Sequence, residues 1–250
     1  MAAVNARPPR APLARALLRL FAVQGSYNYE RLLGVGVGVA EEPLLRDLGD
    51  SKYRPAVARG AQFFNAHPYL IGLVVGAAAR AEHDGAAPDQ IERLREALCG
   101  PLGSLGDRLV WAGWLPFLSA LTLAAIALGA GWIAVGAFLI VYNIGHVALR
   151  WWALQAGWTH GVRVSVALHH PALQKAGALL GPAMAFAVGA ALPLTAAYLA
   201  APFDSWARAA LASVAALSFV ALRLKGDRLN GLRLSLGLAA VALAGGLIWP

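Results

Sequence analysis

Six residues at breaks between apolar stretches are the positions where this sequence could do chemistry. They share a polar or small side chain and a place beside a turn or a proline: Asn28, Asn65, His67, Gly106, Asp107 and Arg108. In membrane proteins, polar groups beside broken helices line substrate paths or the seams between subunits. Ordinary capping of loops is the alternative interpretation for each cluster.

Other kinds of site are poorly supported. Of the six histidines, His169 and His170 are adjacent, and His83, His146 and His160 are isolated, so no spacing predicts a metal site. No nucleophile elbow, HExxH motif or pair of intramembrane acids is present, so we expect neither a catalytic residue nor a cofactor. No Lys-Ser/Thr pair follows the glycines of "GPLGSLGD" (100–107), which argues against a phosphate loop.

The composition indicates that these residues are held in a membrane. Apolar residues make up 59% of the 250 residues and charged ones 14%, with a mean hydropathy of +0.59. A soluble core of this length cannot hide so much apolar surface. The net charge of +8 suits the cytoplasmic side of a membrane with anionic headgroups. No basic patch with polar or aromatic readers stands out, so no nucleic-acid partner is expected.

The first hundred residues predict short helices rather than classical spans. An amphipathic N-terminal helix is predicted by the helical spacing of Leu13, Leu17, Leu18 and Phe21. Helices are expected over 55–66 and 68–82, with His67 closing the first and Pro68 opening the second. The second helix is too short to cross a bilayer, which favours a re-entrant or protein-buried segment. Residues 89–98 predict an exposed helix.

Long uncharged runs supply the membrane segments. Residues 109–149 carry no Asp, Glu, Lys or Arg and predict two spans, or broken half-spans, divided near Gly129. Gly113 and Pro116 make the first of them a candidate broken helix. Further spans are expected over 176–203, 209–222 and 234–250. Gly100, Gly103 and Gly106 predict tight turns and close helix approach at the mouth of the first run.

Together these patterns predict an all-α integral membrane protein with four or five membrane segments. Its expected parts are an amphipathic N-terminal arm (1–50), a core of broken, re-entrant and transmembrane helices (51–172), and C-terminal transmembrane helices (173–250).

Three stretches carry a family resemblance. They are "QGSYNYERLLGVG" (24–36), "FFNAHPYLIG" (63–72) and "GPLGSLGD" (100–107), in that order and at fitting intervals. They resemble the IID subunit of the mannose/fructose/sorbose family of sugar phosphotransferase systems, over about residues 15 to 200. Family members usually have Pro or Ser where Arg108 stands.

The resemblance implies a multi-pass subunit of the bacterial inner membrane that pairs with a IIC subunit to translocate a mannose-type sugar. Family complexes are trimers of IIC–IID pairs. Phosphate reaches the sugar through separate IIA and IIB proteins, so no histidine here is implied as a phosphocarrier and the chain alone is not implied to be an enzyme. The six candidate residues would then line the sugar path or the IIC interface.

Two other functions stay open at this point. A membrane scaffold could sense the state of the phosphotransferase system without transport, and an intramembrane enzyme would show activity as a purified single subunit. Neighbouring genes for IIA, IIB and IIC would favour transport, whereas an incomplete set would favour regulation.

Overall fold

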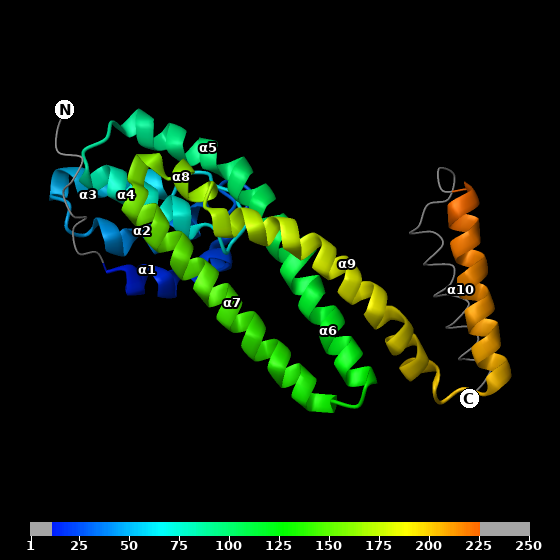
Figure 1. Ribbon diagram of the computed structural model, residues 1–250. Helices are drawn as coiled ribbons and strands as arrows, with labels where there is room; N and C mark the ends of the chain where they lie inside the picture. The colour runs from blue at the N-terminus through cyan, green and yellow to red at the C-terminus, as the bar shows by residue number, and fades with distance from the viewer. Residues whose placement is uncertain (1–11, 226–250) are drawn as a thin grey trace. The chain divides into compact units, whose positions relative to one another are not determined.

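The computed structural model describes residues 12–225, and these residues fold into helices (Figure 1). The chain divides into two compact units, residues 1–195 and 196–250, which we describe separately. Within residues 12–225, β-structure is limited to two isolated bridges between loops. The helical elements in chain order are α1 (Leu13–Leu20), η1 (Val23–Ser26), α2 (Gly34–Leu45), α3 (Asp50–Gly60), α4 (Gly72–His83), α5 (Pro88–Gly106), η2 (Asp107–Trp114), α6 (Leu115–Ala127), α7 (Gly131–His160), η3 (Gly161–Arg163), α8 (Ser165–Leu168), α9 (Pro171–Ala200) and α10 (Ser205–Lys225).

Helix α4 forms the centre of the first unit. Ten of its twelve residues are buried, which confirms the expectation of an apolar helix covered by protein. Its main neighbour is the C-terminal part of α7, and glycines make their close approach possible. A Cβ atom on Gly76 would lie 2.4 Å from the backbone nitrogen of Trp158, and one on Gly157 would lie 2.3 Å from the carbonyl oxygen of Leu73. The two backbones therefore touch where side chains would normally intervene.

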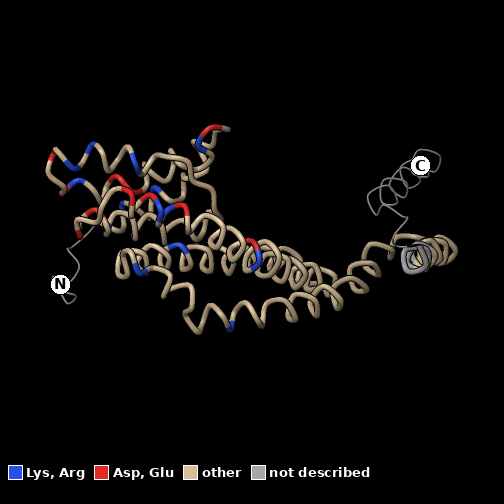
Figure 2. The backbone as a smooth tube through the Cα atoms, turned by 90° about the horizontal axis from the view of Figure 1, so that it is seen from above, with Lys and Arg blue, Asp and Glu red and all other residues tan. Residues whose placement is uncertain are grey.

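Three helical runs are long and apolar enough to cross a membrane: Pro88–Ala127, Gly131–Arg163 and Ser165–Ala200. Charged residues gather over the first part of the chain, including the first half of Pro88–Ala127, and are sparse from residue 109 to residue 200 (Figure 2). α6 packs on α7 and on α9. The turn between α6 and α7 falls at residues 128–130, which confirms the predicted division near Gly129. Of the predicted C-terminal spans, 209–222 lies within α10 of the second unit, and 234–250 lies outside the described residues.

The expected break at Gly113 and Pro116 is wrong. α5, η2 and α6 are one continuous helical run, and its middle, Asp107–Trp114, has the wider π-helical winding. Pro116 lies where the π-helical winding returns to α-helical winding, and because the run is continuous this proline removes one hydrogen bond from the helix. A π-helical segment within an α-helix frequently marks a functional site.

The predicted turns at the three glycines are also wrong, because α5 runs through all of them. The helix expected over 89–98 therefore extends to Gly106, and it is exposed on one side only, because Ile91, Arg95 and Leu98 are buried. The three-residue spacing places Gly100, Gly103 and Gly106 along one side of this helix. The predicted close approach of another helix is not found at Gly106; instead the loop 61–71 comes close, and a Cβ atom on Gly106 would lie 2.2 Å from the Cβ of His67.

The segment between α3 and α4 differs from its prediction as well. Residues 61–71 form a loop, so His67 does not close one helix and Pro68 does not open the next. The reason is tertiary: the N–H of Leu33 donates to the carbonyl of Phe64 at 2.9 Å, and the N–H of Phe64 donates to the carbonyl of Arg31 at 3.2 Å. These bonds hold the segment extended against the loop before α2.

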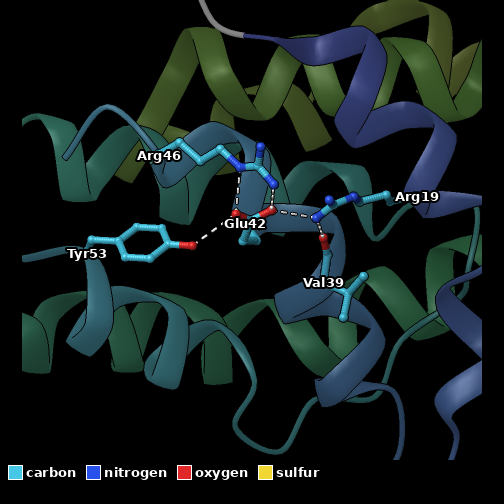
Figure 3. Close-up of polar contacts among 5 residues, drawn as sticks. All are labelled: Arg19, Val39, Glu42, Arg46 and Tyr53. Atoms are coloured by element: carbon cyan, nitrogen blue, oxygen red, sulfur yellow. Dashed lines mark hydrogen bonds and ion pairs between the residues drawn. The ribbon is translucent and has the colours of Figure 1, made fainter. Parts of the chain in front are cut away.

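The amphipathic helix α1 packs on α2 and buries Ala16 and Leu20. Its polar side is tied to α2 and α3 by the cluster around Glu42 (Figure 3), where Arg19 donates to Glu42 at 2.6 Å, Arg46 at 2.6 Å and Tyr53 at 2.9 Å. These hydrogen bonds, that of Arg46 foremost, lower the pKa of Glu42 to about 2. Arg19 thus fixes α1 to α2.

In the second unit, α10 follows a short connection. Arg208 on its first turn donates to the carbonyl oxygens of Phe203 at 2.7 Å and Ala201 at 2.9 Å. These bonds fix the connection to the start of the helix.

Candidate functional site

A polar pocket of about 530 Å³ lies between the loop 61–71 and the C-terminal half of α5. Asn65 and His67 come from the loop, and Ser104 and Asp107 come from the helix. Gly100, Gly103, Ser104 and Asp107 follow one helix face and leave room for the loop, because two of them carry no side chain. The structure therefore brings together three residues that the sequence analysis selected separately: Asn65, His67 and Asp107.

His67 is the deepest polar residue of this pocket, with 2% of its surface exposed. Its Nδ1 accepts a hydrogen bond from the Tyr69 N–H at 3.2 Å, so in the neutral ring the proton is on Nε2. This Nε2 is buried and has no hydrogen-bond partner among the described residues. Burial lowers the pKa of His67 to about 4, against the opposing effect of Asp107. The ring is therefore a neutral, unused donor at physiological pH.

Gly106 and the neighbouring aromatic rings set the position of His67. Gly106 faces the imidazole directly, as its hypothetical Cβ shows. The ring centroid of His67 lies 5.0 Å from that of Tyr69, edge to face, and 5.1 Å from that of Trp111. Asp107, one residue after Gly106, is exposed and forms no ion pair within residues 12–225.

The other two predicted residues do not line the pocket. Arg108 is exposed beside it. Asn28 makes a turn in its own loop, where its Oδ1 accepts hydrogen bonds from the N–H groups of Glu30 at 3.1 Å and Arg31 at 2.9 Å. Arg31 is bonded in turn to the loop segment that holds Asn65. Asn28 is therefore linked to the pocket only through backbone hydrogen bonds.

Sequence reasoning missed a cluster of polar and aromatic residues behind the pocket. The Tyr69 ring lies between Arg150, whose guanidinium carbon is 4.7 Å from its centroid, and His146, whose ring is stacked at 4.9 Å. The Tyr69 hydroxyl is 2.8 Å from that of Tyr142. Arg150 is 4% exposed and donates to the carbonyl of Leu20 at 2.6 Å. A single arginine closing a long uncharged run was the available signal.

A second cluster of buried charged residues lies between α2, α3, α4 and α5. Arg95 donates to Glu41 at 3.1 Å and to the carbonyl of Gly60 at 2.7 Å, and Arg59 donates to Glu82 at 2.7 Å. Burial raises the pKa of Glu41 to about 7, although Arg95 acts in the opposite direction. This cluster joins α2, α3, α4 and α5 and contacts no pocket residue named above.

Comparison with known protein families identifies the family of this chain. Residues 10–202 match the family described as "PTS system mannose/fructose/sorbose family IID component". The chain belongs to this family. The IID assignment agrees with the three ordered motifs and identifies the chain as a membrane component of a sugar phosphotransferase permease.

Individual IID relatives are moderately similar. The sorbose-specific EIID component of Klebsiella pneumoniae is 32% identical over 170 residues, which is 65% of this chain and 62% of that one. The sorbose-specific component of Lacticaseibacillus casei is 30% identical over 61% of this chain and 56% of its own. The mannose-specific component of Escherichia coli K12 is 28% identical over 59% and 54%. The match thus spans little more than half of these relatives' length.

Two solved structures share the IID fold. A structure described as a membrane protein has a TM-score of 0.72 at 21% identity, over 94% of this chain and 96% of that one. A chain from a complex of the mannose transporter ManYZ with microcin E492 has a TM-score of 0.57 at 20% identity, over 97% and 98%. Together with the three apolar helical runs, family membership gives a membrane location.

Proposed function

We propose that this chain is the IID subunit of a phosphoenolpyruvate-dependent permease, and that it pairs with a IIC subunit to carry a mannose-type sugar across the bacterial inner membrane. Its spanning helices pass the membrane several times, and the complex is a trimer of IIC–IID pairs. IIA and IIB proteins carry the phosphate, so the chain alone catalyses no reaction. Sorbose- and mannose-specific relatives support a sugar substrate without selecting one.

The observation that carries the proposal is the unused donor of His67 beside the Asp107 carboxylate and the Asn65 amide. A sugar hydroxyl both donates and accepts, and these three groups offer a donor, an acceptor and an amide that does both. The pocket volume of about 530 Å³ lies within the range of small-ligand sites. If this pocket faces IIC in the complex, the sugar lies at the seam between the two subunits.

Asp107 provides the most direct test of this site. We expect Asp107→Asn to lower sugar uptake about tenfold or more, since a charge-assisted hydrogen bond contributes roughly 1.5–3 kcal/mol. The measurement is uptake of labelled mannose, fructose and sorbose in cells that co-express the cognate IIA, IIB and IIC proteins. The amount of membrane complex should stay at the wild-type level.

Arg108→Ser is the matched control, because Arg108 is adjacent and charged but does not line the pocket. It should leave uptake near the wild-type rate. Uptake unchanged in Asp107→Asn would reduce Asp107 to a residue without a role in transport. A wild-type complex that moves none of the three sugars, in a strain where a known permease restores uptake, would instead favour the scaffold function.

A further inference from the structure

A second cavity, of about 190 Å³, lies between η2, α7 and α9. Its walls are mainly apolar, with Leu109 and Val110 from η2, Leu149 from α7, and Leu173 and Ala176 from α9. All three elements belong to the runs that are apolar enough to span a membrane. The medium that reaches this cavity is therefore the bilayer rather than water.

The cavity lies next to one boundary of the membrane. Arg108 precedes the uncharged run 109–149, Arg150 follows it, and Lys175 precedes the uncharged run 176–203. Except for Tyr69 and Leu173, the lining residues are among the first or last six residues of these runs, which is the depth where hydrocarbon gives way to headgroups. Lysine and arginine at such positions reach toward the headgroup layer.

Apart from Asp107, which precedes Arg108, the charged residues at this boundary are all positive. No Asp or Glu occurs from Arg108 to Phe203. Arg108 and Lys175 are exposed, each is adjacent in sequence to a lining residue, and neither forms an ion pair within the described part of the chain. Arg150, by contrast, is buried against Leu20 and Tyr69. Two exposed cations thus each stand one residue along the chain from a residue that lines the cavity.

We propose that this cavity binds part of one acyl chain of an anionic glycerophospholipid from the surrounding bilayer, and that Arg108 and Lys175 hold its phosphate. An apolar cavity of about 150 Å³ suffices for a benzene-sized molecule, so about 190 Å³ accommodates a segment of an acyl chain. The cations complement the negative headgroup, which a zwitterionic lipid lacks. This site is separate from the polar pocket and does not depend on sugar transport.

Two nitrogens on lining residues fit an oxygen-bearing ligand better than a plain hydrocarbon. Trp114 Nε1 and His146 Nδ1 are buried, and neither has a hydrogen-bond partner among the described residues. Trp114 Nε1 is always a donor, and His146 Nδ1 is a donor in the tautomer that carries the proton there. A buried donor without an acceptor is costly. The ester oxygens of a glycerophospholipid are acceptors that lie between its acyl chains and its phosphate, which is the order of chemistry found here.

The test uses the full chain purified in mild detergent, with its membrane partner co-expressed if the chain alone aggregates. Dioleoyl phosphatidylglycerol and dioleoyl phosphatidylethanolamine are titrated separately, and bound lipid is counted by native mass spectrometry. We expect phosphatidylglycerol to bind more tightly than phosphatidylethanolamine. Its affinity should fall as salt is added, because salt screens the charges. Each cation near the membrane surface raises the affinity for an anionic lipid roughly fivefold. The double variant Arg108→Gln/Lys175→Gln should therefore bind phosphatidylglycerol about 25-fold more weakly.

Two further variants separate the site from general attraction to charge. Ala176→Phe fills the cavity and keeps both cations, so it should remove the tightly bound lipid. Arg163→Gln removes an exposed cation in the α7–α8 connection that does not flank the cavity, and it should leave binding unchanged. Each variant is first shown to elute as the same species as the wild-type protein.

The proposal is overturned if the two lipids bind equally, or if Arg163→Gln weakens phosphatidylglycerol as much as the double variant does. It is also overturned if a cysteine at position 176 cross-links efficiently to a helix of a partner subunit, because that helix would then occupy the cavity. If Ala176→Phe does not fold, the phosphatidylglycerol affinity of the Arg108→Gln/Lys175→Gln variant still tests the proposal.

Discussion

His67 and Glu41 are both buried ionisable side chains, but their surroundings differ in one respect. Glu41 contacts the guanidinium of Arg95, which also bonds Gly60, so the hydrogen bonds of this cluster stay within the protein. His67 bonds only the Tyr69 N–H through Nδ1, and its Nε2 has no partner among the described residues. A polar group whose bonds are satisfied internally holds elements together, whereas an unused donor beside a pocket is available to a ligand.

The comparison predicts that the Glu41 cluster governs stability and that the His67 pocket governs function. Burial favours the neutral form of both side chains: it raises the pKa of Glu41 to about 7 and lowers the pKa of His67 to about 4. Variants at the two places should therefore separate folding from transport.

The largest expected effect is the loss of Arg95. Arg95→Leu leaves Glu41 buried without its cation, which should lower the free energy of unfolding by about 3–5 kcal/mol. Thermal unfolding in detergent, followed by tryptophan fluorescence, measures the change. Arg93→Leu is the matched control, since Arg93 lies on the same helix in an exposed pair with Asp89, and it should change little. Equal losses in both variants would contradict a structural role for the buried pair.

The next prediction uses the opposite pH dependence of the two groups. Because the pKa of Glu41 is raised from 4.5 to about 7, the folded state binds the extra proton, and stability falls by ~3 kcal/mol as pH rises through this window. Because the pKa of His67 is lowered from 6.5 to about 4, stability rises by ~3 kcal/mol as pH rises from 4 to 6.5. In the wild-type protein these two contributions nearly cancel between pH 4.5 and 6.5.

Single variants should expose each contribution. Relative to wild type, Glu41→Gln should become more stable with rising pH over pH 4.5–6.5, and His67→Asn should become less stable. The unfolding midpoint measured at half-unit pH steps gives both slopes, and the remaining titratable groups cancel in the difference from wild type. Parallel curves for all three proteins would show that neither group has the shifted pKa described above.

Sequence reasoning predicted the components of the polar pocket but not how they meet. Asn65, His67 and Asp107 stand out locally, because each lies within three residues of a proline, a glycine or the start of an uncharged run. Local patterns also gave the α6–α7 turn and the buried α4. Membership of the IID family followed from three ordered motifs, which the comparison with known families confirms.

The rest depended on contacts between distant segments. The loop 61–71 is held extended by bonds to Arg31 and Leu33, which no local propensity encodes. α5 continues through three glycines because tertiary packing overrides helix propensity. The stacking of Tyr69 between Arg150 and His146 joins residues about eighty positions apart. No periodicity in the sequence reveals such a contact.

The smallest effect that we predict distinguishes two glycines on the same face of α5. Gly106→Ala places a Cβ 2.2 Å from the Cβ of His67, whereas the atom nearest to a Cβ on Gly103 is the Cα of Ala66 at 4.0 Å. Gly103→Ala should therefore stabilise the helix by about 0.5–1 kcal/mol, the ordinary gain of alanine over glycine. Gly106→Ala should instead cost about 1–3 kcal/mol, because the loop that carries His67 must move.

The same pair of variants sharpens the functional side of the comparison. Displacing His67 changes the position of its ring at the pocket, so sugar uptake per complex should fall in Gly106→Ala and stay normal in Gly103→Ala. Uptake normalised to the amount of complex in the membrane, together with the unfolding midpoint of each purified variant, provides both readings. If Gly106→Ala lowers the midpoint but transports normally, His67 is a packing residue like Glu41, and the contrast between the two buried groups would not hold.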